Sequence, residues 1–218
     1  MKHLYFMPGM AASPLIFEHI HLPEDEFSMH FLSWEIPYEK ESLSDYALRM
    51  TQKIKHSSPV LIGVSFGGVL VQEMARHITV DQLVIISSVK SKRELPRRMK
   101  LSRKLKLYKI LPTRLIGNID KVAKYVFGVT AKHRVELYKK YLAMNEVVYL
   151  DWALEKMICW DQKEPPIDLI HIHGDADRVF PFRYIEGCIR VPGGTHIMIL
   201  AKHRWFNENL PKILSENA

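Results

Sequence analysis

Short apolar runs alternate with helical patterns over the first 90 residues of the chain and again after residue 165. Apolar runs of about four to eight residues are typical of buried strands, and apolar positions three and four residues apart predict amphipathic helices. Strands that alternate with helices form a parallel sheet covered on both faces. We therefore expect an α/β fold with a doubly wound, mostly parallel six-stranded sheet. The predicted strands are 2–7, 27–34, 59–64, 82–88, 167–173 and 187–191, and the predicted helices are 13–20, 42–56, 66–78 and 198–214.

Residues 90–160 have a different pattern. They lack the alternation of a strand, and their apolar positions recur at helical spacing. We expect this segment to be a helical insertion in one domain that spans residues 1–218. The predicted helices of the insertion are 94–109, 119–127, 131–145 and 147–160.

A Gly63-x-Ser65-x-Gly67 motif connects a predicted strand directly to a predicted helix. A serine on such a sharp turn has its hydroxyl pushed out of the fold, and glycines flank it because the backbone there is crowded. The N–H groups that open the following helix favour negative charge nearby. The motif is therefore typical of a presented nucleophile, although a glycine-rich turn with an uninvolved serine occurs by chance in some chains of this length.

Two loops further along the chain carry candidates for the partners of a nucleophilic serine. The strand at 167–173 leads into Asp175 and Asp177, and the strand at 187–191 leads through a Gly-Gly-Thr sequence to His196. The glycines before His196 free the loop to bring the imidazole over the edge of the sheet. The resulting order along the chain, serine, then aspartate, then histidine, is that of the α/β-hydrolase triad.

These motifs resemble those of the α/β-hydrolase superfamily over most of residues 1–90 and 165–218. They read Gly-Val-Ser-Phe-Gly, His-Gly-Asp-Ala-Asp-Arg-Val-Phe-Pro and Gly-Gly-Thr-His. The resemblance implies that Ser65 is the nucleophile, His196 the general base and then acid, and Asp177 the carboxylate that orients the imidazole. Asp175 is the rival for the last role, and the family pattern favours the later aspartate.

The resemblance also implies an oxyanion hole and a place for the insertion. One donor is the backbone N–H after the loop glycine, which is Met10 here, and the other is the N–H of Phe66. Many relatives have His-Gly where this chain has Pro8-Gly9, but backbone donors leave the role possible. Relatives insert a helical cap over the active site at the position of residues 90–160.

The positive charge of the chain is concentrated in the insertion. The whole chain has a net charge of +7, whereas residues 90–141 contain 17 lysines and arginines against three acids, so this segment carries +14 and the remainder −7. A solvated face of a cap helix explains such a run most simply. Steering of an anionic substrate and weak contact with a membrane surface are the alternatives. We do not expect nucleic-acid binding, because no aromatic ladder or known module accompanies the charge.

Composition places the chain among ordinary globular domains. Its 218 residues are 47% hydrophobic, enough for one sizeable core, and no apolar run approaches the ~18 residues of a membrane span. Its first residues only faintly suggest a signal peptide, whose cleavage would remove the first strand. The two cysteines, Cys159 and Cys188, lie in apolar surroundings without a disulfide pattern. We therefore expect a cytoplasmic protein.

Two other patterns have simple structural explanations. Residues His171, His173, Asp175 and Asp177 alternate as metal ligands could, but alternate residues of a half-buried strand also share a packing face. We therefore expect neither a metal nor an organic cofactor. Aromatic and methionine residues of the insertion could line an acyl pocket, but packing between helices explains them better. They are Tyr141, Met144, Tyr149, Trp152, Met157 and Trp160.

The sequence therefore predicts a serine hydrolase that cleaves a small carboxylic ester or thioester through an acyl-enzyme, and an anionic ester or thioester is one of the substrates it allows. The same triad can serve C–C bond hydrolysis, lyase-type elimination, acyl transfer or perhydrolysis, and the fold does not select among them. A dehalogenase is disfavoured, because its family uses an aspartate where this chain has Ser65. A non-catalytic protein that holds an anionic ligand or a membrane surface is the alternative from another class. The oligomeric state is not predicted.

Overall fold

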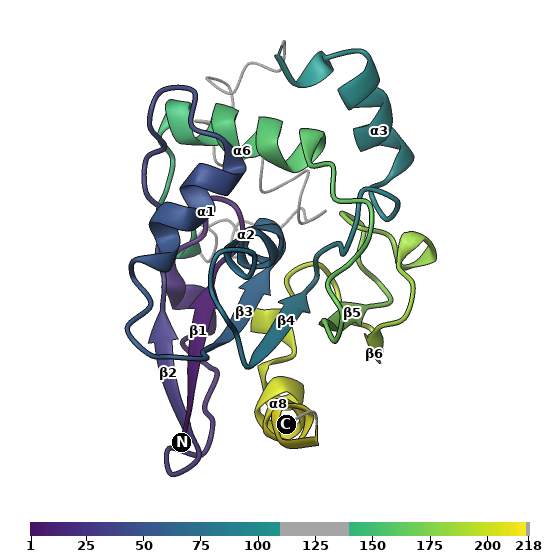
Figure 1. The fold of residues 1–218 in the computed structure, drawn as a ribbon. Coiled ribbons are helices and arrows are strands. Elements are labelled where there is room, and N and C mark those ends of the chain that lie inside the picture. Colours follow the sequence, from purple (N-terminus) through teal and green to yellow (C-terminus); the bar gives the residue numbers. More distant parts are fainter. Residues whose placement is uncertain (110–139, 217–218) are drawn as a thin grey trace.

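A six-stranded parallel sheet forms the centre of the protein (Figure 1). The computed structural model describes residues 1–109 and 140–216. The strands are β1 (Lys2–Met7), β2 (Phe27–Phe31), β3 (Val60–Val64), β4 (Gln82–Ile86), β5 (Ile170–Gly174) and β6 (Ile189–Val191). They lie in the order β2-β1-β3-β4-β5-β6, and every neighbouring pair is parallel. The predicted fold class is confirmed.

Helices cover both faces of the sheet, because side chains of a buried strand alternate between two apolar layers. One layer joins Tyr5, Leu61 and Ile85 of the sheet to the helices α1, α2 and α6. The opposite layer joins Leu4 and Ile62 to η1, α7 and α8. The bounds of these helices are η1 (Pro14–Phe17), α1 (Leu43–Thr51), α2 (Phe66–Met74), α6 (Val147–Cys159), α7 (Met198–Ala201) and α8 (His203–Glu216).

The main differences from the predicted elements lie at their ends. The predicted helix 13–20 is only a 3-10 turn: Ser13 caps it, Pro14 opens it, and the chain turns away after Phe17. The predicted helix 198–214 is two helices that break at Lys202. Apolar periodicity continues past an element wherever the next residues are also buried, so it predicts the existence of elements better than their ends.

The described part of the insertion is helical, as predicted. The predicted helix 94–109 is the helix α3 (Arg97–Lys104) followed by η2 (Leu107–Lys109), and the predicted helix 147–160 is α6. The predicted helix 119–127 lies outside the described residues, as does most of 131–145, whose described end is not helical after Tyr141. Figure 1 shows α3 and α6 beyond the carboxyl ends of the strands.

The aromatic side chains of α6 pack inward. Tyr149 and Trp152 are buried against Trp34, Tyr46 and Phe66, with ring centroids 4.5–6.0 Å apart. They therefore join α6 to the layer that contains α1 and α2, as expected of core residues. Within the described ranges, no helix is long and apolar enough to cross a membrane.

The packing of α8 yields a stability prediction. The Phe206 ring is fully buried against the sheet. We expect Phe206→Ala to lower the free energy of unfolding by about 3–5 kcal/mol through lost burial and a residual cavity. The matched control is Glu208→Ala on the exposed side of α8, expected to stay within about 0.5 kcal/mol of wild type. Urea denaturation measures both, and equal losses would contradict the packing of this helix.

Candidate active site

The turn between β3 and α2 places Ser65 at the carboxyl edge of the sheet. Its backbone has a positive φ of 54°, which strains a residue with a side chain. The Ser65 N–H donates to the carbonyl of Ile86 at 2.9 Å, and Ser88 Oγ donates to the Ser65 carbonyl at 2.6 Å. A Cβ at Gly67 would lie 2.3 Å from the carbonyl oxygen of Pro8. This turn therefore needs glycine after the serine.

Ser65, His196 and Asp177 form one chain of hydrogen bonds. Ser65 Oγ lies 2.9 Å from His196 Nε2, and His196 Nδ1 lies 2.9 Å from Asp177 Oδ2. The Asp177 side chain is completely buried, and the His196 side chain is 10% exposed. Such a geometry lets the imidazole take a proton from the hydroxyl while the carboxylate stabilises the resulting positive charge.

The loop after β5 holds the Asp177 carboxylate in place. Its Oδ1 accepts hydrogen bonds from the N–H groups of Val179 and Phe180, at 2.7 and 2.9 Å. Burial would raise the pKa of Asp177, but the charge and hydrogen bond of His196, together with the hydrogen bond from the Phe180 N–H, outweigh it, so the pKa is lowered. The carboxylate is therefore ionised at neutral pH.

The rival aspartate lies elsewhere. Asp175 Oδ2 accepts from Arg190 Nε and Nη2 at 2.8 and 2.6 Å, and Asp175 Oδ1 accepts from the Gly193 N–H at 2.7 Å. The pKa of Asp175 is lowered by these bonds, first by that of Arg190. The structure thus brings Asp177 to His196 and uses Asp175 to tie the two loops together.

Two buried histidines of β5 support the loop that carries Asp177, here called the acid loop. His173 Nε2 lies 2.9 Å from the carbonyl of Phe180, and His171 Nε2 lies 3.1 Å from His173 Nδ1. The Phe180 ring in turn packs edge-on against the imidazole of His196, with centroids 5.5 Å apart. Burial lowers the pKa of both inner histidines, most strongly that of His171. They are therefore neutral groups that support the loop.

The loop after β1 lies against the serine turn. A Cβ at Gly9 would contact the Ser65 Cβ at 3.4 Å, and Trp34 Nε1 donates to the Gly9 carbonyl at 2.7 Å. In the described part of the chain, no turn, loop or side-chain acceptor takes the N–H of Met10 or Phe66. Both predicted oxyanion donors are thus available on the two turns that meet at Ser65.

The inserted segment holds the loop after β1 from its other side. Tyr149 Oη of α6 accepts from the Ala11 N–H at 3.3 Å. The Ala11 carbonyl accepts from the N–H groups of Ala143 and Met144, and the Ser13 N–H donates to the carbonyl of Tyr141. A positive φ of 62° at Ala11 is kept by these bonds. The insertion therefore positions the loop that carries Met10.

Three histidines near the amino end of the sheet are the one group in the described ranges with ligand atoms close enough for a metal. His3, His30 and His56 place them within 4.8 Å of one another. The rings of His3 and His56 are stacked, however, with centroids 3.5 Å apart and planes 9° apart. Nitrogen lone pairs lie in the ring plane, so two parallel rings cannot direct them at one ion. We therefore assign no metal to this cluster.

Sequence patterns did not reveal several residues that shape the site. Trp34, Tyr149, His173 and Ser88 each hold a backbone group of the serine, acid or oxyanion loops. Two of them carried a signal that pointed elsewhere: the alternation of His173 with His171 suggested a metal, and Tyr149 belonged to an aromatic pattern explained by helix packing or an acyl pocket. Contacts between segments so distant in sequence have no local pattern, so sequence alone could not find them.

The buried histidines give a pH prediction. The unfolded chain protonates them near their usual pKa of about 6.5, above the pKa of the folded protein. The free energy of unfolding is therefore unaffected by protonation of these histidines above about pH 6.5. Below that pH it falls by up to about 1.4 kcal/mol per pH unit for each histidine. Asp177, with a lowered pKa, adds a loss only below about pH 4.

The test is urea denaturation of wild type and His171→Gln between about pH 7.5 and 5.5. We expect a smaller loss of unfolding free energy in the variant, because one of the two buried histidines is gone. The matched control, His21→Gln, replaces an exposed histidine and keeps the wild-type pH slope. A wild-type slope in His171→Gln would contradict the assigned role of burial.

None of the protein-family models and none of the curated proteins matches this sequence. Solved structures do match the fold. Bacillus megaterium epoxide hydrolase matches with a TM-score of 0.72 and 16% identity, covering 99% of this chain and 94% of that chain. A thermophilic esterase from Thermogutta terrifontis matches at 0.70 and 14%, covering 100% and 90%. A Bacillus anthracis bromoperoxidase matches at 0.69 and 15%, covering 98% and 92%. The chain therefore has the α/β-hydrolase fold.

Proposed function

We propose that this protein is a serine hydrolase that cleaves a carboxylic ester or thioester. The observation that carries the proposal is the chain of hydrogen bonds from Ser65 Oγ through His196 to Asp177, with both links at 2.9 Å. The N–H groups of Met10 and Phe66, for which the described residues offer no turn, loop or side-chain acceptor, support it. The similar folds include an esterase and an epoxide hydrolase, which favours hydrolysis as the reaction class.

The first half of the reaction acylates Ser65. Its hydroxyl proton passes to His196 Nε2 as Oγ attacks the substrate carbonyl, and the His196 Nδ1–H donates to Asp177. The negative charge that develops on the carbonyl oxygen is stabilised by the N–H groups of Met10 and Phe66. When the tetrahedral intermediate collapses, the leaving alcohol or thiol takes the proton from Nε2 and departs.

The second half of the reaction releases the acid. Water enters the place of the leaving group and gives a proton to His196 Nε2 as its oxygen attacks the acyl carbon. The second tetrahedral intermediate uses the same two backbone donors. Its collapse breaks the bond to Ser65 Oγ, and the proton returns from Nε2 to the serine. The enzyme is then in its starting state, with no cofactor consumed.

We propose the cytoplasm as the site of this reaction. Cys159 and Cys188 are both free thiols. Free thiols persist in reducing compartments, whereas secreted domains of this size commonly carry disulfides. This location follows from the cysteines alone and is independent of the catalytic proposal.

Ser65→Ala tests the proposed nucleophile. We expect the turnover of ester and thioester substrates to fall by at least about 10³-fold, because no acyl-enzyme can form. A fluorophosphonate probe should label wild type on Ser65, as located by peptide mass mapping, and leave the variant unlabelled. Ser44→Ala on the exposed side of α1 is the control and should react as wild type does. Full turnover by pure Ser65→Ala would disprove the serine mechanism.

Tyr149→Phe tests whether the insertion positions the oxyanion loop. The variant removes the acceptor of the Ala11 N–H but keeps the buried ring. Loss of one hydrogen bond, worth about 0.5–1.5 kcal/mol, should lower kcat by up to about tenfold. KM should change little, because the donors act chiefly in the transition state. A KM effect without a kcat effect would instead place Tyr149 in substrate binding.

A further inference from the structure

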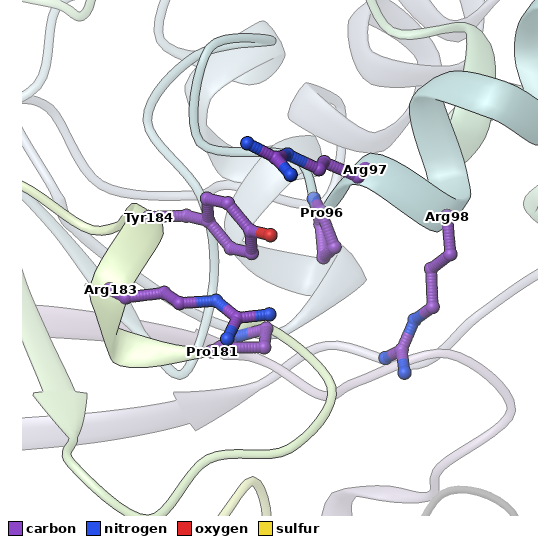
Figure 2. A pocket seen from close by; sticks show the side chains of 6 residues that line it. All are labelled: Pro96, Arg97, Arg98, Pro181, Arg183 and Tyr184. Atoms are coloured by element: carbon purple, nitrogen blue, oxygen red, sulfur yellow. The ribbon is translucent and has the colours of Figure 1, made fainter.

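A pocket lined by arginines lies beside the loop that carries Asp177. Its volume of about 470 Å³ is in the range of small-molecule sites. Its walls come from the start of α3 and from η4 (Phe182–Tyr184), two segments far apart in the sequence. None of its lining residues is acidic: they are Pro96, Arg97, Arg98, Pro181, Arg183 and Tyr184 (Figure 2).

The polar groups of this pocket are arranged around one space. Figure 2 shows the guanidinium groups of Arg97 and Arg183 on opposite sides of the Tyr184 hydroxyl. The Arg183 guanidinium also lies 5.0 Å from the centroid of the Tyr184 ring. Three hydrogen-bond donors from two segments thus border the same cavity. Guanidinium groups are well suited to bind the oxygens of phosphates and carboxylates.

Three other basic residues near α3 have acidic partners. Lys92 and Arg103 both bind Asp161, at 3.0 and 2.9 Å, and Arg93 binds Glu164 at 2.7 Å. By contrast, within residues 1–109 and 140–216 no carboxylate pairs with Arg97 or with Arg183. Two like charges beside an acid-free cavity repel each other until an anion lies between them. The local charge therefore favours an anionic ligand.

The walls of the pocket are held in place before any ligand binds. Pro96 precedes α3 and Pro181 precedes η4, each with a φ of −58° that the proline ring restrains. Arg98 Nη2 donates to the carbonyls of Arg178 and Val179 at 3.0 and 2.8 Å, which ties α3 to the acid loop. Binding at this pocket therefore requires little ordering of the backbone, and preorganisation of this kind favours affinity.

The pocket is close to the reacting groups. Pro181 follows Asp177 by four residues, so their Cα atoms are at most roughly 14 Å apart. Phe180, the residue before Pro181, packs against the His196 ring. An anion in the pocket is therefore within reach of a carbonyl at Ser65 if a spacer of several bonds joins them.

We propose that this pocket binds an anionic group, a phosphate or a carboxylate, which the substrate of Ser65 carries at the end remote from its reacting carbonyl. The enzyme would thereby select esters or thioesters whose acyl or leaving group ends in an anion. This substrate role rests on the proposed hydrolase function, whereas the binding of an anion to Arg97 and Arg183 does not.

The first experiment measures anion binding without catalysis. Isothermal titration of the full chain at low salt uses inorganic pyrophosphate and succinate as separate probes, so that phosphate and carboxylate chemistry are distinguished. We expect one equivalent of at least one probe to bind wild type, and Arg97→Gln/Arg183→Gln to lose it. The matched control, Lys104→Gln/Arg204→Gln, removes the same amount of charge from exposed positions outside the pocket. This control should bind the probe as wild type does.

The second experiment measures selectivity as a ratio. Each protein is given a coenzyme A thioester and the neutral N-acetylcysteamine thioester of the same acyl group, and in parallel the monoester of a dicarboxylic acid with its neutral diester. We expect the ratio of kcat/KM, anionic over neutral, to fall about 10- to 100-fold in Arg97→Gln/Arg183→Gln, from the loss of charged hydrogen bonds. The control double variant should keep the wild-type ratio. It loses the same net charge, and so the same long-range attraction of anions, but it keeps the two arginines of the pocket.

The outcomes separate the two proposals. Hydrolysis with no anion binding, or with the same ratio in the pocket and control variants, would overturn the anion site and leave the hydrolase intact. Anion binding that depends on the two arginines, with no turnover of any ester, would support the site and overturn the hydrolase and the substrate role. Thermal denaturation verifies folding, and if the double variant unfolds, Arg183→Gln alone replaces it.

Discussion

The sharp backbone turn at Ser65 is the constraint on which the candidate active site depends. A positive φ costs roughly 1–3 kcal/mol at a residue with a side chain, and it persists only where the surroundings enforce it. Here β1 and β4 enclose β3, and the loop after β1 passes so close that Gly67 admits no Cβ. The same close approach places the loop of the proposed donor Met10 against the serine turn, so the strain at Ser65 and the proposed function have one structural cause.

The segment predicted as an insertion supports the candidate site as the sheet does. Tyr149 of α6 and the backbone of residues 141–144 hydrogen-bond to the loop that carries Met10, and aromatic packing anchors α6 to the core. This segment is therefore more than a cover over the strand ends. A change in its packing would move a proposed oxyanion donor, and this links the segment to the proposed chemistry.

The charge of the insertion has two different uses within the described residues. Toward Asp161 and Glu164, its lysines and arginines form ion pairs, which explains part of the basic run as ordinary surface structure. Toward η4, Arg97 of this segment lines the same pocket as Arg183, and no acidic residue lines that pocket. The simplest explanation from sequence, a solvated helix face, therefore holds for some of these residues, whereas Arg97 has a local environment that favours an anion.

The sequence by itself determined the parallel sheet, the serine turn and the chain order of the candidate triad, because periodicity and glycine spacing are local properties. It left Asp175 and Asp177 as rivals two residues apart. Only the tertiary structure placed one at His196 and the other at Arg190. It alone brought Arg97 to Arg183, because such contacts depend on how distant segments pack, and packing has no signature within either segment.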